Sequence, residues 1–185
     1  MPSLRYIDYD LLSAANDWIE QSEEDNVAAE KLFWTRADEY TKNVDMLRPR
    51  LSKPAWEFFR HGYGPTGFHD ATLIAMKVGD GLHFGDRNRR RAAAQIEFLN
   101  FEEDRHYLFD FRGAYGVWTE IVVNNSVEGI GDLYSYEIID VDDRLLQLGF
   151  LFASGSSIIF QFHKLVFKRK TTRRTNPVSD TKEKI

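Results

Sequence analysis

The sequence contains no cysteine, which excludes a disulfide framework, a thiol nucleophile and a cysteine-based zinc site. It also lacks long apolar runs, and its first ten residues carry no basic region followed by an apolar core. Neither a signal peptide nor a membrane span is therefore predicted, and a cytoplasmic protein is expected.

Common catalytic motifs are missing as well. There is no Gly-x-Ser-x-Gly elbow and no phosphate loop of the Gly-x-x-x-x-Gly-Lys type. No histidines stand at the His-x-x-x-His or His-Glu-x-x-His spacing of zinc sites. The sequence therefore predicts no metal site, no cofactor and neither a covalent hydrolase nor a nucleotide hydrolase.

Charge is distributed unevenly along the chain. The net charge is -5, but residues 168–185 carry +5, so that residues 1–167 carry -10. An acidic body argues against nucleic-acid binding, which needs a basic face, and would suit a basic protein partner. The need for solubility explains an acidic surface equally well.

The first third of the chain has helical periodicity. A short helix is predicted over 10–21, and a longer one begins after Ser22, a cap followed by acidic residues, and ends near Arg48, before a proline. A third helix is predicted between Ser52 and Gly62. Its three aromatic residues are expected to attach it to a sheet: Trp56, Phe58 and Phe59. The apolar positions of the long helix follow a 4-3-4-3 spacing: Phe33, Ala37, Tyr40, Val44 and Leu47.

A glycine-rich loop at 62–67 separates these helices from a region of strands. Residues 133–167 alternate apolar and polar side chains in three runs, with turns at Asp140–Arg144 and Ala153–Ser156, and this pattern predicts a β-meander. Further strands are predicted at 68–78, 81–85, 92–101, 106–112 and 117–123.

These elements predict an α+β protein: N-terminal helices followed by a mainly antiparallel, curved sheet or sandwich of seven or eight strands. A single domain is expected over 1–170, with a helical segment at 1–62 and a β region at 66–168. Residues 171–185 are expected to form a disordered basic tail.

The most suggestive local string is Phe68-His69-Asp70-Ala71 at the start of the first strand. A histidine beside an aspartate suits acid/base chemistry or metal binding. Neighbouring strand residues point to opposite faces, so His69 and Asp70 could act together only where the chain is irregular.

A second candidate site is the strand face that carries Asp110 and Arg112, opposite Phe109 and Phe111. If this face is covered the charges must pair, and if it is open they could bind a partner. Glu97 poses the same question. A basic cluster could clamp phosphate or carboxylate groups, although no aromatic residues are interleaved with it: Arg87, Arg89, Arg90 and Arg91.

Aromatic and histidine side chains supply the remaining candidates. An aromatic mouth for a small molecule could be built from Trp56, Tyr63, Tyr115 and Trp118. The other histidines are expected to be hydrogen-bonded structural residues: His61, His83, His106 and His163.

With the string FHDATLIAM, the strands QIEFLNF and LFDFR, and the closing LLQLGFLFASGSSIIFQFHKLVF, the chain resembles a loose group of uncharacterised bacterial proteins over residues 60–168. In that group a Phe/Leu-His-Asp-Ala/Ser string opens a mostly antiparallel sheet. The resemblance implies an immunity or partner protein, with His69 and Asp70 as the matching positions.

Three functions are compatible with the sequence. The first is a non-catalytic protein-binding or immunity-type module with an acidic surface. The second is an enzyme or metal-binding protein that uses His69 and Asp70. The third is a small-molecule binding sheet.

Overall fold

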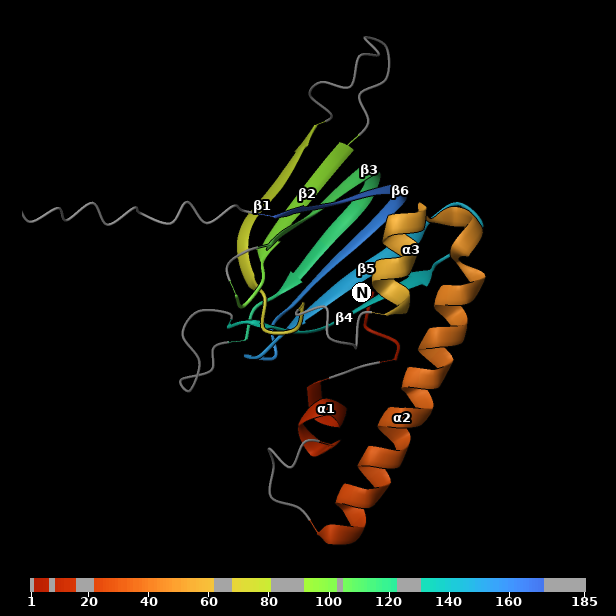
Figure 1. Cartoon of the computed structure of the whole chain (residues 1–185), viewed down its shortest axis with the longest axis vertical. Coiled ribbons are helices and arrows are strands. Elements are labelled where there is room, and N and C mark those ends of the chain that lie inside the picture. Colours follow the sequence, from red (N-terminus) through yellow and green to blue (C-terminus); the bar gives the residue numbers. More distant parts are fainter. Residues whose placement is uncertain are drawn as a thin grey trace, which may run out of the picture.

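The computed structural model describes residues 2–6, 9–15, 22–61, 68–80, 92–102, 105–122 and 131–171. Within them, three α-helices precede a curved antiparallel sheet, and the predicted α+β class is confirmed (Figure 1). The strands lie in the order β1-β2-β3-β6-β5-β4. The elements are α1 (Tyr9–Ala15), α2 (Glu23–Met46), the 3-10 turn η1 (Arg48–Arg50), α3 (Lys53–Arg60), β1 (Thr72–Asp80), β2 (Ala92–Leu99), β3 (Arg105–Glu120), β4 (Leu133–Asp140), β5 (Leu146–Phe152) and β6 (Ser157–Thr171).

Helix boundaries follow the capping signals in the sequence. The Ser22 hydroxyl accepts a hydrogen bond from the Asp25 N–H at the start of α2, and the helix ends at Met46, before Pro49. Ser52 directly precedes α3. Among the described helices, none has the length and apolar composition that a membrane span requires.

The β-meander is confirmed, because β4, β5 and β6 are consecutive antiparallel neighbours. The turn between β5 and β6 contains Gly155 at a φ of +86°, a conformation that suits glycine.

Other strand predictions are corrected. The predicted strands 106–112 and 117–123 are one strand, β3, because Gly113 to Gly116 form an irregularity within the ladder to β6 and make no reversal. The described sheet therefore has six strands where seven or eight were predicted. The predicted strand 81–85, the arginine cluster at 87–91 and the loop at 62–67 lie outside the described residues, as does the predicted tail beyond Thr171.

The core occupies one face of the sheet, which we call the inner face, and α3 covers it. Phe58 of α3 lies at its centre, with ring centroids 4.6–5.8 Å from those of six other aromatic residues. The predicted role of the α3 aromatics is thereby confirmed, since Phe58 and Phe59 are buried and Trp56 packs against the same core. The six rings around Phe58 belong to Phe59, Phe68, Tyr107, Phe109, Tyr136 and Phe167.

The sheet curls so far that its two ends meet at one point. The Asp70 N–H donates to the Leu133 carbonyl at 2.8 Å, and the Leu133 N–H donates to the Ala71 carbonyl at 2.9 Å. These bonds join the chain just before β1 to the first residue of β4, although β1 and β4 are the opposite edges of the sheet.

Residues 2–6, the N-terminal arm, cover part of the opposite, outer face. The Glu137 carboxylate of β4 accepts the backbone N–H groups of Arg5 and Tyr6 at 2.6 and 2.8 Å. A Cβ on Gly149 of β5 would lie against Leu4 Cδ2 of the arm, so any larger residue there would displace the Leu4 side chain.

Helix α2 protects the free edge of β4. The Asn43 side-chain amide donates to the Ile138 carbonyl at 2.8 Å, and the Ile138 N–H donates to the Tyr40 hydroxyl at 3.3 Å. Pairing of these strand groups with side chains prevents them from pairing with another chain.

Candidate functional site

His69 and Asp70 lie in a turn that precedes β1. Their side chains meet, with 2.7 Å between His69 Nδ1 and Asp70 Oδ2, because Asp70 has a φ of +62° and the chain is not extended here. The side chains are 65% and 57% exposed. The dyad therefore lies on the surface, at the point where the sheet edges meet.

The described histidines do not converge on a common site. His163 Nδ1 contacts the Arg144 carbonyl oxygen at 3.1 Å, the His61 ring meets the Trp56 ring edge-on, and His106 pairs with Glu97. His83 lies outside the described residues. No group of three His, Asp or Glu side chains in the described ranges could hold a metal ion.

The structure places the described members of the predicted aromatic mouth at separate positions. Trp56 packs against the core on the inner side, whereas Trp118 lies against Gly116 on β3 and Tyr115 is exposed at the β3 irregularity. Tyr63 lies outside the described residues. Because one of its four members is not described, the aromatic mouth stays a prediction.

Asp110 and Arg112 do lie on one face of β3, as predicted, with Phe109 and Phe111 buried on the other. This is the outer face, and here the N-terminal arm does not cover it. Arg112 is exposed, whereas Asp110 exposes only 7% of its surface. Asp110 makes no side-chain hydrogen bond or ion pair within the described part of the chain.

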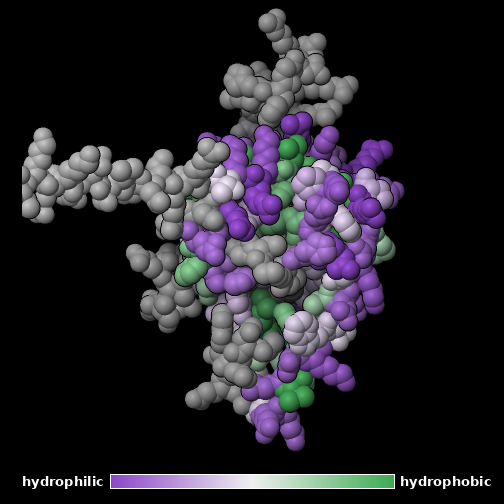
Figure 2. Space-filling model, in the orientation of Figure 1, coloured by the Kyte–Doolittle hydropathy of each residue, from purple (hydrophilic) through white to green (hydrophobic). Residues whose placement is uncertain are grey.

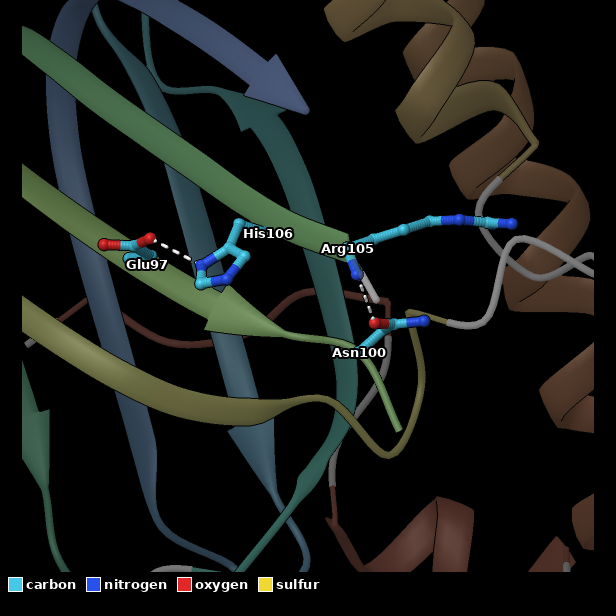
Figure 3. A network of polar contacts seen from close by, with 4 residues as sticks. All are labelled: Glu97, Asn100, Arg105 and His106. Carbon is cyan, nitrogen blue, oxygen red and sulfur yellow. Dashed lines mark hydrogen bonds and ion pairs between the residues drawn. The ribbon is translucent and has the colours of Figure 1, made fainter. Parts of the chain in front are cut away.

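Glu97 and His106 lie on the same outer face, one from β2 and one from β3 (Figure 3). Glu97 Oε1 is 2.8 Å from His106 Nδ1, and both side chains are about one-third exposed. At the adjoining turn, the Arg105 N–H donates to the Asn100 side-chain oxygen at 2.8 Å. These contacts join β2 to β3 across the hairpin at one end of the outer face.

Helix α2 carries a feature that the apolar periodicity does not reveal. Its spacing predicted the buried face correctly, since Tyr40, Val44 and Leu47 are buried. Trp34 falls outside that pattern and is 60% exposed, with its indole N–H 3.4 Å from Glu30 Oε1.

Trp34 belongs to what we call the acidic stripe, a row of side chains with spacings of three or four residues along α2. Such spacings place side chains on one helix face. Every member is exposed: Glu23, Val27, Glu30, Trp34 and Asp38. Figure 2 shows apolar side chains among hydrophilic ones at the end of α2 that projects beyond the sheet in Figure 1. The sequence did contain a signal for this stripe. Trp34 falls outside the apolar spacing of the helix and has an acidic residue one turn away on either side.

Comparisons of the chain with protein-family models, with characterised proteins and with solved structures found no match. The resemblance to a group of bacterial proteins therefore remains a prediction.

Proposed function

We propose that this protein is a non-catalytic, immunity-type binding module, which holds a basic protein partner on the acidic stripe of α2. The observation that carries the proposal is the exposed Trp34 between Glu30 and Asp38, each one helical turn away.

Trp34 is an exposed aromatic residue, whereas the aromatic residues of the core are buried. Tryptophan is enriched among the residues that dominate the affinity of protein interfaces, because it buries a large apolar area on binding. Val27 continues the apolar part of the stripe one turn beyond Glu30. A partner would therefore find an apolar centre with a charged rim, the usual composition of an interface.

The charge of the stripe selects the partner. Glu23, Glu30 and Asp38 are exposed, and the stripe itself carries no cation. Complementary charge raises the association rate and rejects acidic partners, an effect that salt weakens. The balance of -10 over residues 1–167 adds a long-range attraction in the same direction.

The projecting position of α2 supports the same function. The carboxyl-terminal half of α2 is anchored to β4 through Tyr40 and Asn43, while the half that carries Val27 and Trp34 packs against α1. A helix held in this way can present a face without rearrangement, which lowers the entropic cost of binding.

The test is a comparative affinity capture from native lysate at low and high salt. The wild type should retain a basic protein in stoichiometric amount, and this protein should be lost as salt rises. Trp34→Ala and Glu30→Lys should each reduce the capture about tenfold or more, whereas Lys31→Glu, which adds a negative charge beside the stripe, should increase it.

Phe101→Ala is the matched control, because Phe101 is also an exposed aromatic residue but lies in the β2–β3 turn. It should leave capture unchanged. Equal loss with Trp34→Ala and Phe101→Ala would contradict the proposal, as would capture that neither Trp34→Ala nor Glu30→Lys reduces, or the absence of any basic protein.

A further inference from the structure

Within the described residues, the part of the outer face that the N-terminal arm does not reach forms a regular array of side chains from four strands. The register of the sheet aligns them in four rows that cross β1, β2, β3 and β6. We call this array the lysine face. Its rows are Thr72, Leu99, His106 and Lys170; Ala75, Glu97, Leu108 and Lys168; Lys77, Gln95, Asp110 and Val166; and Gly79, Ala93, Arg112 and Lys164.

The lysine face has the opposite charge to the rest of the protein. Five cationic side chains are exposed on it, against two carboxylates, although the chain as a whole is acidic. The lysines do not pair with any acidic side chain within the described part of the chain. The cations are Lys77, Arg112, Lys164, Lys168 and Lys170.

Asp110, near the centre of this array, is a carboxylate with little exposed surface. It is more than nine-tenths buried and has no hydrogen-bond partner in the described ranges. Its cross-strand neighbours are Gln95 on β2 and Val166 on β6. Its carboxylate oxygens are not among the fully buried atoms that lack a partner, so solvent reaches them, and a ligand that donates hydrogen bonds could replace that solvent.

Another carboxylate of the same sheet does receive hydrogen bonds from a second segment. Glu137 also points to the outer face and is 1% exposed, but it accepts two backbone N–H groups from the N-terminal arm, an irregular segment that lies across the strands. Gln147, from the adjacent strand, donates to the Ser3 carbonyl of this arm. The arm is thus an internal example of a peptide segment bound to the outer face through an acidic side chain.

From this parallel we infer that the lysine face binds an acidic, extended polypeptide segment, whose backbone N–H groups donate to Asp110 while its acidic side chains pair with the lysines. Lys168 and Lys170 are two residues apart in β6, about 6.6 Å at the usual rise of a strand. Alternate side chains of an extended peptide repeat at the same distance.

A nucleic acid fits this surface less well. None of the residues in the four rows has an aromatic ring on which a base could stack, apart from the imidazole of His106, which is held by Glu97. Glu97 and Asp110 would repel a phosphate backbone, which has no N–H group to offer them. A peptide backbone can satisfy Asp110 and a phosphate backbone cannot.

The test is an NMR titration of the nitrogen-15-labelled protein with a peptide of alternating Glu and Thr. Shifts should be confined to the lysine face, and the affinity should fall as salt rises. Lys168→Glu combined with Lys170→Glu should weaken binding about tenfold or more. Lys42→Glu, an exposed charge reversal on α2 and away from the lysine face, is the control and should not change the affinity beyond the general effect of net charge.

Asp110→Ala separates a binding role from a structural one. It should weaken binding of the Glu-Thr peptide about tenfold, yet leave the Tm nearly unchanged, because the Asp110 carboxylate accepts no hydrogen bond from the described residues. A lowered Tm would show that Asp110 has a structural partner and would overturn its assigned role.

Three other results would overturn the inference. These are no shifts at the lysine face with the peptide, equal weakening by Lys42→Glu and by the β6 double substitution, and tighter binding of oligothymidylate of the same length than of the peptide. The last result would make the surface a nucleic-acid site.

Discussion

Asp70 combines a strained backbone with an exposed side chain. A φ of +62° is uncommon for residues other than glycine, although aspartate tolerates it better than most. The Asp70 N–H donates a hydrogen bond to the Leu133 carbonyl where the two edges of the sheet meet. The uncommon backbone conformation therefore serves the fold. The His69 and Asp70 side chains face water, and an exposed pair of this kind contributes at most about 1 kcal/mol.

Glu137 should be among the most sensitive polar residues of the sheet. We expect Glu137→Ala to lower the free energy of unfolding by about 3 kcal/mol, because the Arg5 and Tyr6 N–H groups lose a charged acceptor. Glu137→Gln keeps one acceptor atom and should lose about half as much. Urea denaturation measures both.

Glu120→Ala is the control for this prediction, since Glu120 is exposed at the end of β3 and should change stability by less than about 0.5 kcal/mol. A Glu137→Ala variant as stable as Glu120→Ala would mean that the arm is not held by this carboxylate.

At the scale of elements, α2 combines two tasks in its two halves. Its carboxyl-terminal half supplies hydrogen bonds to the edge of β4, and its first half presents Trp34. Because the two halves of α2 have different tasks, apolar side chains lie on both its buried and its exposed faces, and the helix is only weakly amphipathic.

Asn43→Ala should destabilise the protein by about 2 kcal/mol, because it leaves the buried Ile138 carbonyl without a donor. Tyr40→Phe, which removes only the acceptor of the Ile138 N–H, should cost about 1 kcal/mol. Chemical denaturation gives both values, and amide exchange at Ile138 should be faster in the second variant. Lys42→Ala, between these positions but exposed, should have little effect; comparable losses in all three would argue for a general effect on the helix.

The turn between β4 and β5 should make a pH-dependent contribution. Hydrogen bonds from the Arg144 and Leu145 N–H groups to Asp142 Oδ1, at 2.6 and 2.8 Å, lower the pKa of Asp142 below its ordinary value of 3.8. A lowered folded-state pKa means that this stabilisation is present above about pH 4 and is lost as the pH falls through the folded value.

Asp142→Asn should therefore lower the Tm at pH 7, and the difference from wild type should shrink in strong acid, where both side chains are neutral. Thermal scans at the two pH values measure this. Asp143→Asn, in the same turn but outside these two hydrogen bonds, should lower the Tm at pH 7 by less, and a constant difference for Asp142→Asn would exclude an ionised carboxylate as the cause.

At the scale of the whole molecule, one aromatic side chain connects the helical and sheet layers. Phe58→Ala should cost about 3–5 kcal/mol, because it removes the ring that contacts six others between α3 and the sheet. Phe58→Leu should lose less. Trp34→Ala, a truncation of a larger but exposed ring, should change stability by less than about 0.5 kcal/mol. Calorimetry or urea denaturation measures all three, and similar values for Phe58→Ala and Trp34→Ala would contradict the assigned core.

The molecule also separates its charge between layers. The exposed carboxylates of the acidic stripe lie on α2, and the exposed cationic side chains of the lysine face lie on β1, β3 and β6. Two partners of opposite charge could therefore bind at the same time, each through complementary fields.

The sequence by itself determined the elements and their order. Caps at Ser22 and Ser52, apolar spacing in α2 and alternation in β4, β5 and β6 predicted these boundaries, because backbone sterics and the burial of one face act over a few residues. Gly113 to Gly116 misled the prediction, since the same glycines suit a turn and an irregular strand.

Only the tertiary structure decided which carboxylate receives hydrogen-bond donors from another segment. Glu137 and Asp110 have the same local pattern, each a carboxylate between buried strand residues, but the N-terminal arm reaches only Glu137. Likewise, the spacing of residues in α2 left open whether another element would bury Trp34. In the structure no described element covers it. Alternation and helical spacing define which face a side chain occupies, whereas long-range packing determines what lies against that face.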